Sequence, residues 1–311
     1  MTPNLSHDVF PAMGTTCEVT LVDGNEALLA RARERVEELE SRWSRFRENS
    51  EISRLNRRAG RATKLSYDSY LLVDRAVEAW RLTEGRYDPT VLRAMEAAGY
   101  DRSFERVLAE PTAAGGAAPP APGCSGIVLD PRRMKATLPA GVGFDPGGIG
   151  KGLAADLVVD LLLEEGAAGA CVSLGGDGRM AGEPPPGGWQ VGIANPYDET
   201  ELVAVAVVED HGVATSSRLI RQWTAGGVRR HHLLDPRTGQ SIENGLDAAT
   251  VIAPCAWMAE ILTKAAFVAG AAKGAELVRD LGAAGLLIEG LERMHTAGPF
   301  RSFLAPVPTA A

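Results

Sequence analysis

The chain has 311 residues, which is enough for one large domain or two small ones with a full hydrophobic core. It carries 32 Lys and Arg residues against 40 Asp and Glu residues, and the net charge of -8 disfavours a general nucleic-acid binder or a protein of anionic membranes. The four cysteines are far apart and form no CxxC motif, so neither a zinc site nor a disulfide framework is expected.

The N-terminal region begins with MTPNLSHDVFPAMGTT, which has no basic segment, apolar run or cysteine for lipid attachment. No later segment reaches the ~20 apolar residues of a membrane span. We therefore expect a cytoplasmic protein that is not inserted in a membrane.

The first regular elements follow this region. Residues 16–22 alternate in the manner of a half-buried strand, and residues 26–46 repeat apolar side chains at helical spacing. The polar stretch SRFRENSEISRLNRRAG, residues 44–60, is typical of a solvated loop or a short helix. Residues 67–82 again have the helical period.

A turn is predicted at Asp88 and Pro89, with a helix starting at Thr90. These residues suit a capping arrangement and a ligand contact equally well. Residues 109–123 are rich in Ala, Pro and Gly, so we expect an exposed and flexible loop. Residues 126–129 and 134–138 are predicted to pair as a hairpin.

The stretch GVGFDPGGIGKGLAADLVVD, residues 141–160, places six glycines and Lys151 just before a helix that we expect at 149–165. Glycines let a ligand approach main-chain N–H groups, and the free N–H groups of a helix N-terminus attract phosphate. The spacing matches neither the P-loop nor the GxGxxG fingerprint. By itself the stretch suits a pyrophosphate site and a tightly packed turn equally well.

Beyond this helix, residues 170–174 form a predicted strand that leads into a second glycine turn, SLGGDGRMAG. Residues 189–194 and 202–208 are also predicted strands. Residues 212–217, GVATSS, end a strand in hydroxyl side chains. These hydroxyls suit phosphate binding and turn capping, and both alternatives stay open.

The segment RRHHLLDPRTGQ groups two histidines with Asp235 and Arg237 around a proline turn. Most surface histidines have no catalytic role. An imidazole at a strand end and close to a carboxylate, however, can transfer a proton near neutral pH. His232 is therefore the candidate general base.

The C-terminal part contains a predicted strand at 250–253 and an apolar helix at 258–269. Polar groups on this helix are few, and Glu260 and Lys264 are spaced to form an i,i+4 pair worth ~0.2 to 0.5 kcal/mol. In the whole chain, strands outnumber βαβ units. This favours the α+β class over a doubly wound sheet.

Taken together, these motifs resemble the ApbE family, the FAD:protein FMN transferases. They occur in order along nearly the whole chain as MGTTCEVTL, RYDPTV, DPGGIGKGLAAD, SLGGDGRMAG, ATSS, HHLLDPRTG, and TVIAP followed by AEILTKAAFVAG. The resemblance implies a single domain over residues 1–311, with an α+β fold whose mixed or antiparallel sheets and flanking helices surround a central FAD cleft. It also implies an enzyme that transfers FMN from FAD through a phosphoester bond to a threonine of an acceptor flavoprotein and releases AMP.

The resemblance further implies which residues surround FAD. The expected pyrophosphate cradle is made of Gly147, Gly148, Gly150 and Lys151. The expected catalytic residues are His232, Lys151 and Asp235. The other expected contacts are Met13, Asp88, Thr90, Asp145, Gly175, Gly176, Asp177, Thr215, Ser216 and Ser217.

Magnesium is also implied by the family, whose members commonly hold it with an Asp and, four residues later, a Thr. This chain has Glu260 and Lys264 there. An ammonium cannot coordinate magnesium. Two alternatives follow: either Glu260 and the Gly150 carbonyl hold the metal, or Lys264 stands in its place.

Two other functions suit the same motifs. A protein that binds FAD without transferring FMN would account for Lys264. An FAD pyrophosphatase would use water in place of the protein hydroxyl and would give FMN and AMP.

Overall fold

The centre of the protein is an antiparallel sheet, seen in a computed structural model that describes residues 3–110, 118–291 and 293–305. Within these residues the sheet has eight strands in the order β1-β2-β6-β7-β10-β13-β14-β15. Strands from both ends of the chain thus share one sheet. They are β1 (Leu5–Ala12), β2 (Thr15–Val22), β6 (Gly169–Leu174), β7 (Asp177–Gly182), β10 (His211–Ser217), β13 (Leu246–Ala253), β14 (Ala284–Glu289) and β15 (Arg293–Ala297).

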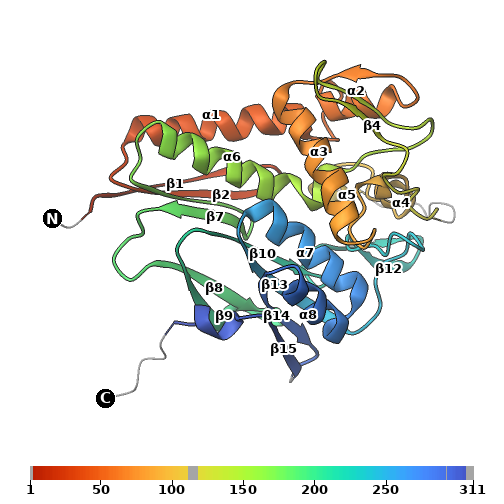
Figure 1. The fold of residues 1–311 in the computed structure, drawn as a ribbon. Helices are drawn as coiled ribbons and strands as arrows, with labels where there is room; N and C mark the ends of the chain where they lie inside the picture. Colours follow the sequence, from red (N-terminus) through yellow and green to blue (C-terminus); the bar gives the residue numbers. More distant parts are fainter. Residues whose placement is uncertain (1–2, 111–117, 292, 306–311) are drawn as a thin grey trace.

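Helices cover one face of this sheet (Figure 1): α1 and α6 pack on its β1 to β7 half, and α7 and α8 pack on its β10 to β15 half. No helix in the described ranges is long and apolar enough to cross a membrane. The helices are α1 (Glu26–Trp43), α2 (Glu51–Arg57), α3 (Tyr67–Leu82), α4 (Leu92–Ala97), α5 (Phe104–Ala109), α6 (Gly150–Glu164), α7 (Ala256–Ala269) and α8 (Ala271–Asp280).

The opposite face is covered by the hairpin of β8 (Trp189–Asn195) and β9 (Asp198–Val208). Strand β13 is therefore buried at every position. Its Val251 belongs to the core under the helices, and the next residue, Ile252, belongs to the core under β8 and β9. Smaller sheets join β3 (Thr63–Lys64), β5 (Lys135–Thr137) and β4 (Val128–Asp130), and β11 (Gln222–Ala225) with β12 (Val228–His231).

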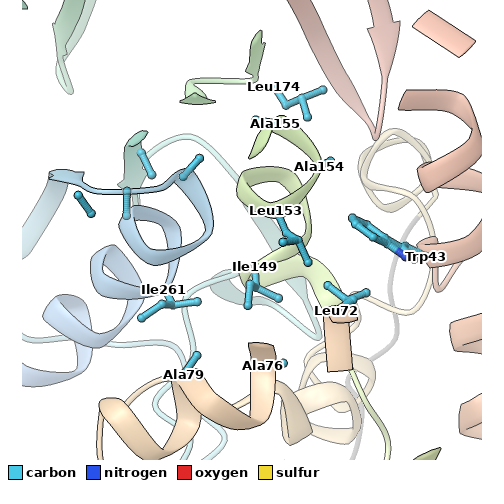
Figure 2. Close-up of a cluster of buried hydrophobic side chains, with 14 of the residues drawn as sticks. Trp43, Leu72, Ala76, Ala79, Ile149, Leu153, Ala154, Ala155, Leu174 and Ile261 are labelled. Carbon is cyan, nitrogen blue, oxygen red and sulfur yellow. The ribbon is translucent and has the colours of Figure 1, made fainter. Parts of the chain in front are cut away.

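The start of α6 is buried among the other helices, with Ile149 and Leu153 almost without exposed area. Figure 2 shows Ile149 near Ile261 of α7, and Leu153 one turn further along α6 on the side of Leu72 and Trp43. Helices α6 and α7 come so close that a Cβ on Gly152 would lie 2.4 Å from the carbonyl oxygen of Ala256. This packing fixes the position of the glycine loop that precedes α6.

The predicted α+β class with antiparallel sheets and flanking helices is confirmed. The helix predicted at 67–82 has the same ends in α3, and the helix predicted at 149–165 is α6. The helix predicted at 26–46 ends earlier, at Trp43, because Ser44 is extended (φ -60°, ψ 121°). The four cysteines are free thiols, as expected.

The second glycine stretch contains a strand that the sequence did not indicate. Only Gly175 and Gly176, with φ of 62° and 89°, make the turn, and β7 then pairs with β6. The N-terminal hairpin was also missed. Its two-residue turn is Met13 and Gly14, both with positive φ, which matches the twist of the strands that it joins.

The loop predicted at 109–123 is only partly described, since 111–117 lie outside the described residues. Ala109 ends α5. Beyond the gap, the N–H of Ala121 donates to the carbonyl of Pro236 (2.7 Å), and the N–H of Gly123 donates to Oγ1 of Thr90 (2.9 Å). Residues 118–123 are thus attached to the segments that carry the predicted site.

Candidate active site

The glycine loop forms a 3-10 turn (η2, Pro146–Gly148) before α6 begins. The carboxylate of Asp145 accepts the N–H of Gly147 at 2.8 Å and so closes the turn. Its other oxygen lies 3.4 Å from Nε of Arg45, a guanidinium that is almost completely buried. The Asp145 carboxylate therefore joins the amide of Gly147 in the loop to Arg45, which is distant in the sequence, and this fixes the loop.

Two lysine–carboxylate pairs lie beside the first turn of α6. Lys151 forms an ion pair with Asp177 of β7, and Nζ of Lys264 lies 3.3 Å from Oε1 of Glu260. The N–H of Gly152 donates to Oε2 of Glu260 at 2.8 Å. Burial opposes the charge on Lys151, but Asp177 and Glu260 outweigh it and raise the pKa of Lys151. Lys151 is thus a cation at neutral pH.

Gly148 lets the loop pass close to Tyr87. A Cβ on this glycine would lie 2.9 Å from Cε2 of the Tyr87 ring, closer than real Cβ contacts. Burial raises the pKa of the Tyr87 hydroxyl well above its usual value. This hydroxyl has no hydrogen-bond partner among the described residues, so a ligand could accept its proton in a hydrogen bond.

His232 directly follows β12. Burial, followed by the cations of Arg221 and Lys264, lowers the pKa of His232 well below its usual value. The ring is therefore neutral at pH 7 and can accept a proton, and its Nδ1 has no hydrogen-bond partner in the described part of the chain. The preceding His231 is engaged elsewhere, with Nε2 3.0 Å from the carbonyl oxygen of Ile242.

These groups meet at a cavity of about 420 Å³, a volume within the range of ligand sites. Its wall combines aromatic rings with arginine and lysine side chains. Lys264 is part of it. The predicted site residues on the wall are Met13, Asp88, Asp145, Gly147, Gly148, Gly150, Lys151 and His232.

The other predicted site residues are not on this wall: Thr90, Gly175, Gly176, Asp177, Thr215, Ser216, Ser217, Asp235 and Glu260. The carboxylate of Asp88 accepts the N–H of Thr90 (2.8 Å) and so caps the turn, and the Thr90 hydroxyl donates to the same oxygen (2.5 Å). The hydroxyl of Ser216 lies 2.7 Å from that of Thr263. The hydroxyl of Ser217 accepts the N–H of Leu219 (3.1 Å), as a turn cap does. Their contact with a ligand stays a prediction.

Asp235 is held by the residue two positions later. Its carboxylate accepts the backbone N–H of Arg237 at 2.9 Å and two guanidinium N–H groups at 3.0 and 2.7 Å. In the described residues, no hydrogen bond joins Asp235 to His232. The arrangement closes the proline turn after His232, and a catalytic role for Asp235 stays a prediction.

Sequence reasoning missed the arginines of the cavity wall. Arg221 donates to the hydroxyl of Tyr100 (3.2 Å) and to the carbonyl of Gly14 (3.0 Å). Arg45 lies over the rings of Phe46 and Tyr100, 4.2 and 4.8 Å from their centroids. Arg221 follows the ATSS motif by four residues, which was an available signal. Arg45 belongs to the polar stretch 44–60, in which nothing in the sequence indicated a site residue.

A sequence model of the ApbE family matches residues 13–287 of this chain. The chain belongs to the ApbE family. The FAD:protein FMN transferase of Haemophilus influenzae is 30% identical over 281 residues, which cover 85% of this chain and 81% of that protein. A protein of Klebsiella pneumoniae with the same name is 27% identical over 288 residues, covering 86% of this chain and 83% of its own.

Solved structures of the ApbE family have the same fold. The ApbE protein of Thermotoga maritima superposes with a TM-score of 0.82 over 97% of this chain and 100% of its own, at 24% identity. The flavin transferase ApbE of Vibrio cholerae gives 0.82 over the same shares, at 23% identity.

The expected magnesium site does not fit the residues that are present. Both oxygens of Glu260 are engaged, one by Gly152 and the other by the ammonium of Lys264. No group of three His, Cys, Asp or Glu side chains within the described ranges is placed to hold a metal. Magnesium requires about six oxygen ligands in octahedral geometry. One carboxylate oxygen nearby, Oδ1 of Asp177, lacks a partner among the described residues, and it cannot provide such a shell.

Proposed function

We propose that this ApbE-family protein transfers the FMN part of FAD to a threonine of an acceptor flavoprotein and releases AMP. The observation that carries the proposal is the cavity at which the glycine loop, a charged lysine and a neutral histidine meet. It lies in a chain that matches the family over residues 13–287 and resembles relatives named FAD:protein FMN transferase.

The transfer needs a base for the incoming hydroxyl, and His232 is suited to this role. The threonine oxygen bonds to the phosphorus on the FMN side, and the bond from that phosphorus to the bridging oxygen breaks. AMP leaves with the electron pair, and the threonine proton passes to His232. A neutral imidazole is required at the start, which agrees with the low pKa of His232.

Positive charge on the cavity wall supports the binding of a diphosphate. Lys151 lies next to Gly150, and Arg221 lines the same cavity. Fixed cations of this kind stabilise the charge that develops on the leaving phosphate. We assign Gly147, Gly148 and Gly150 to the diphosphate cradle together with Lys151.

We also infer a single domain over residues 1–311. The pairing of β1 and β15 with the other strands of one sheet supports this, since separating the two ends would divide the sheet. A cytoplasmic location stays a prediction, which fractionation of cells would test.

The proposed transfer is tested by incubating the protein with FAD and purified candidate flavoproteins, each paired with a variant in which the target threonine is replaced by valine. The expected result is a fluorescent band that survives denaturing electrophoresis and equimolar AMP. The valine variants should remain unlabelled. Equal labelling of a flavoprotein and its valine variant would contradict the proposal.

The same assay separates the two alternatives. An FAD pyrophosphatase would release AMP and free FMN without a labelled acceptor. A protein that only binds FAD would quench its fluorescence and release no AMP.

A further inference from the structure

The two lysines on the cavity wall share one arrangement. Lys151 and Lys264 line the cavity, with 22% and 17% of their side chains exposed. Their partners, Asp177 and Glu260, are not on the wall, and their side chains have no exposed area. A ligand in the cavity therefore meets the ammonium groups, and the carboxylates lie behind them.

This arrangement makes the part of the wall formed by Lys151 and Lys264 positive towards the cavity. Each buried carboxylate fixes an ammonium, and Glu260 is itself fixed by the N–H of Gly152 at 2.8 Å. A divalent cation placed at Lys151 and Lys264 would meet two positive groups before it reached the carboxylates of Asp177 and Glu260. A diphosphate would meet two donors whose positions are already set, so little ordering is needed on binding.

We propose that Lys264, together with Lys151, takes the place of a metal ion and binds the diphosphate of the substrate directly. The inference takes its substrate, FAD, from the proposed function. It makes a separate claim, that neither binding nor transfer requires a divalent cation. The metal dependence of FAD binding tests this claim even where no transfer is measured.

The first experiment titrates the wild-type protein with FAD in EDTA and in magnesium chloride, and follows the quenching of flavin fluorescence. The two dissociation constants should agree within about twofold. Any transfer should also survive EDTA. Tenfold tighter binding in magnesium, or transfer that is lost in EDTA and restored by magnesium, would overturn the inference.

Failure of the inference can be told from failure of the proposed function. Binding that is indifferent to magnesium but leads to no transfer would refute the function and support the inference. Transfer that requires magnesium would support the function and refute the inference. Absence of FAD binding in both solutions would refute both.

The second experiment changes the charge itself. Lys264→Met keeps the length of the side chain and should weaken FAD binding by ~10-fold or more, as expected when a charged donor is lost. Lys273→Met is the matched control, since Lys273 is exposed on α8 and is not on the cavity wall; its affinity should not change. Equal affinities of the two variants would contradict the role of Lys264.

The third experiment restores oxygen ligands with the double variant Glu260→Asp and Lys264→Thr. Its FAD affinity should become dependent on magnesium, and calorimetry with magnesium chloride should detect binding that the wild type lacks. A folded double variant that stays indifferent to magnesium would count against the inference. If circular dichroism shows that it does not fold, the wild type and Lys264→Met decide the question.

Discussion

The carboxylate of Asp156 in α6 accepts the backbone N–H of Ala256 at 2.8 Å and so caps the first turn of α7 from a neighbouring helix. It also accepts the N–H of Trp257 at 2.9 Å. Burial raises the pKa of Asp156 to about 6, against the opposing effects of these two bonds and of Arg179. The two helices that carry the lysines of the cavity are therefore joined by a titratable group.

This carboxyl predicts a pH dependence of stability. Asp156 loses its proton near pH 3.8 when unfolded and near pH 6 when folded, so the folded state holds more protons between these values. Its contribution to stability is complete below pH 3.8 and is lost as the pH rises through 6. We expect the free energy of unfolding of the wild type to fall by about 2 kcal/mol relative to Asp156→Asn between pH 4 and pH 7. Urea unfolding of both proteins measures this difference, and parallel pH curves would contradict it.

Gly148 gives a prediction about the loop. In Gly148→Ala the new Cβ would lie 2.9 Å from the Tyr87 ring, so the ring or the loop must move. We expect FAD binding to weaken by ~10-fold or more, since small displacements of positioning groups are costly. Fluorescence titration measures the affinity.

Gly150→Ala provides the comparison within the same loop. Its Cβ would lie 3.7 Å from Cβ of Pro146, which is an ordinary contact. The loss of affinity should therefore be smaller than in Gly148→Ala. The opposite order would show that contact with Tyr87 does not limit the loop.

Arg221 gives a prediction about the base. Its guanidinium is one of the cations that lower the pKa of His232, after burial. Arg221→Ala should therefore raise this pKa towards its usual value, and Arg221→Lys, which keeps the charge, should raise it less. An NMR titration of histidine-labelled protein measures both. Identical His232 titrations in the three proteins would show that the charge of Arg221 has no effect.

Local sequence patterns predicted the helices whose buried face follows from the spacing of their own apolar residues. Helix α3 has the predicted ends because its apolar side chains repeat at the helical spacing and Ser66 caps its start. The i,i+4 pair of Glu260 and Lys264 was predicted in the same way and is present. What spacing could not show is that Glu260 is completely buried, because this depends on the approach of α6.

The residues missed in the site depend on contacts between distant segments. Arg45 looks like a solvated residue in its polar stretch, yet its Nη2 donates to the carbonyl of Tyr100, 55 residues away (2.9 Å). Lys151 meets Asp177 only because β7 lies beside α6. Such partners follow from the topology of the sheet, which the resemblance to a family implied and the local patterns did not.

His232 gives the prediction that bears most directly on catalysis. His232→Ala should lower FMN transfer by ~10² to 10⁴, the usual contribution of a general base, and should leave the affinity for FAD nearly unchanged. Because burial and the nearby cations lower its pKa, the wild-type rate should not fall between pH 8 and pH 6 through protonation of this group. The control is His7→Ala, an exposed imidazole that lies 3.0 Å from the hydroxyl of Thr20 and is not on the cavity wall. Transfer by His232→Ala at the rate of this control would remove His232 from the mechanism.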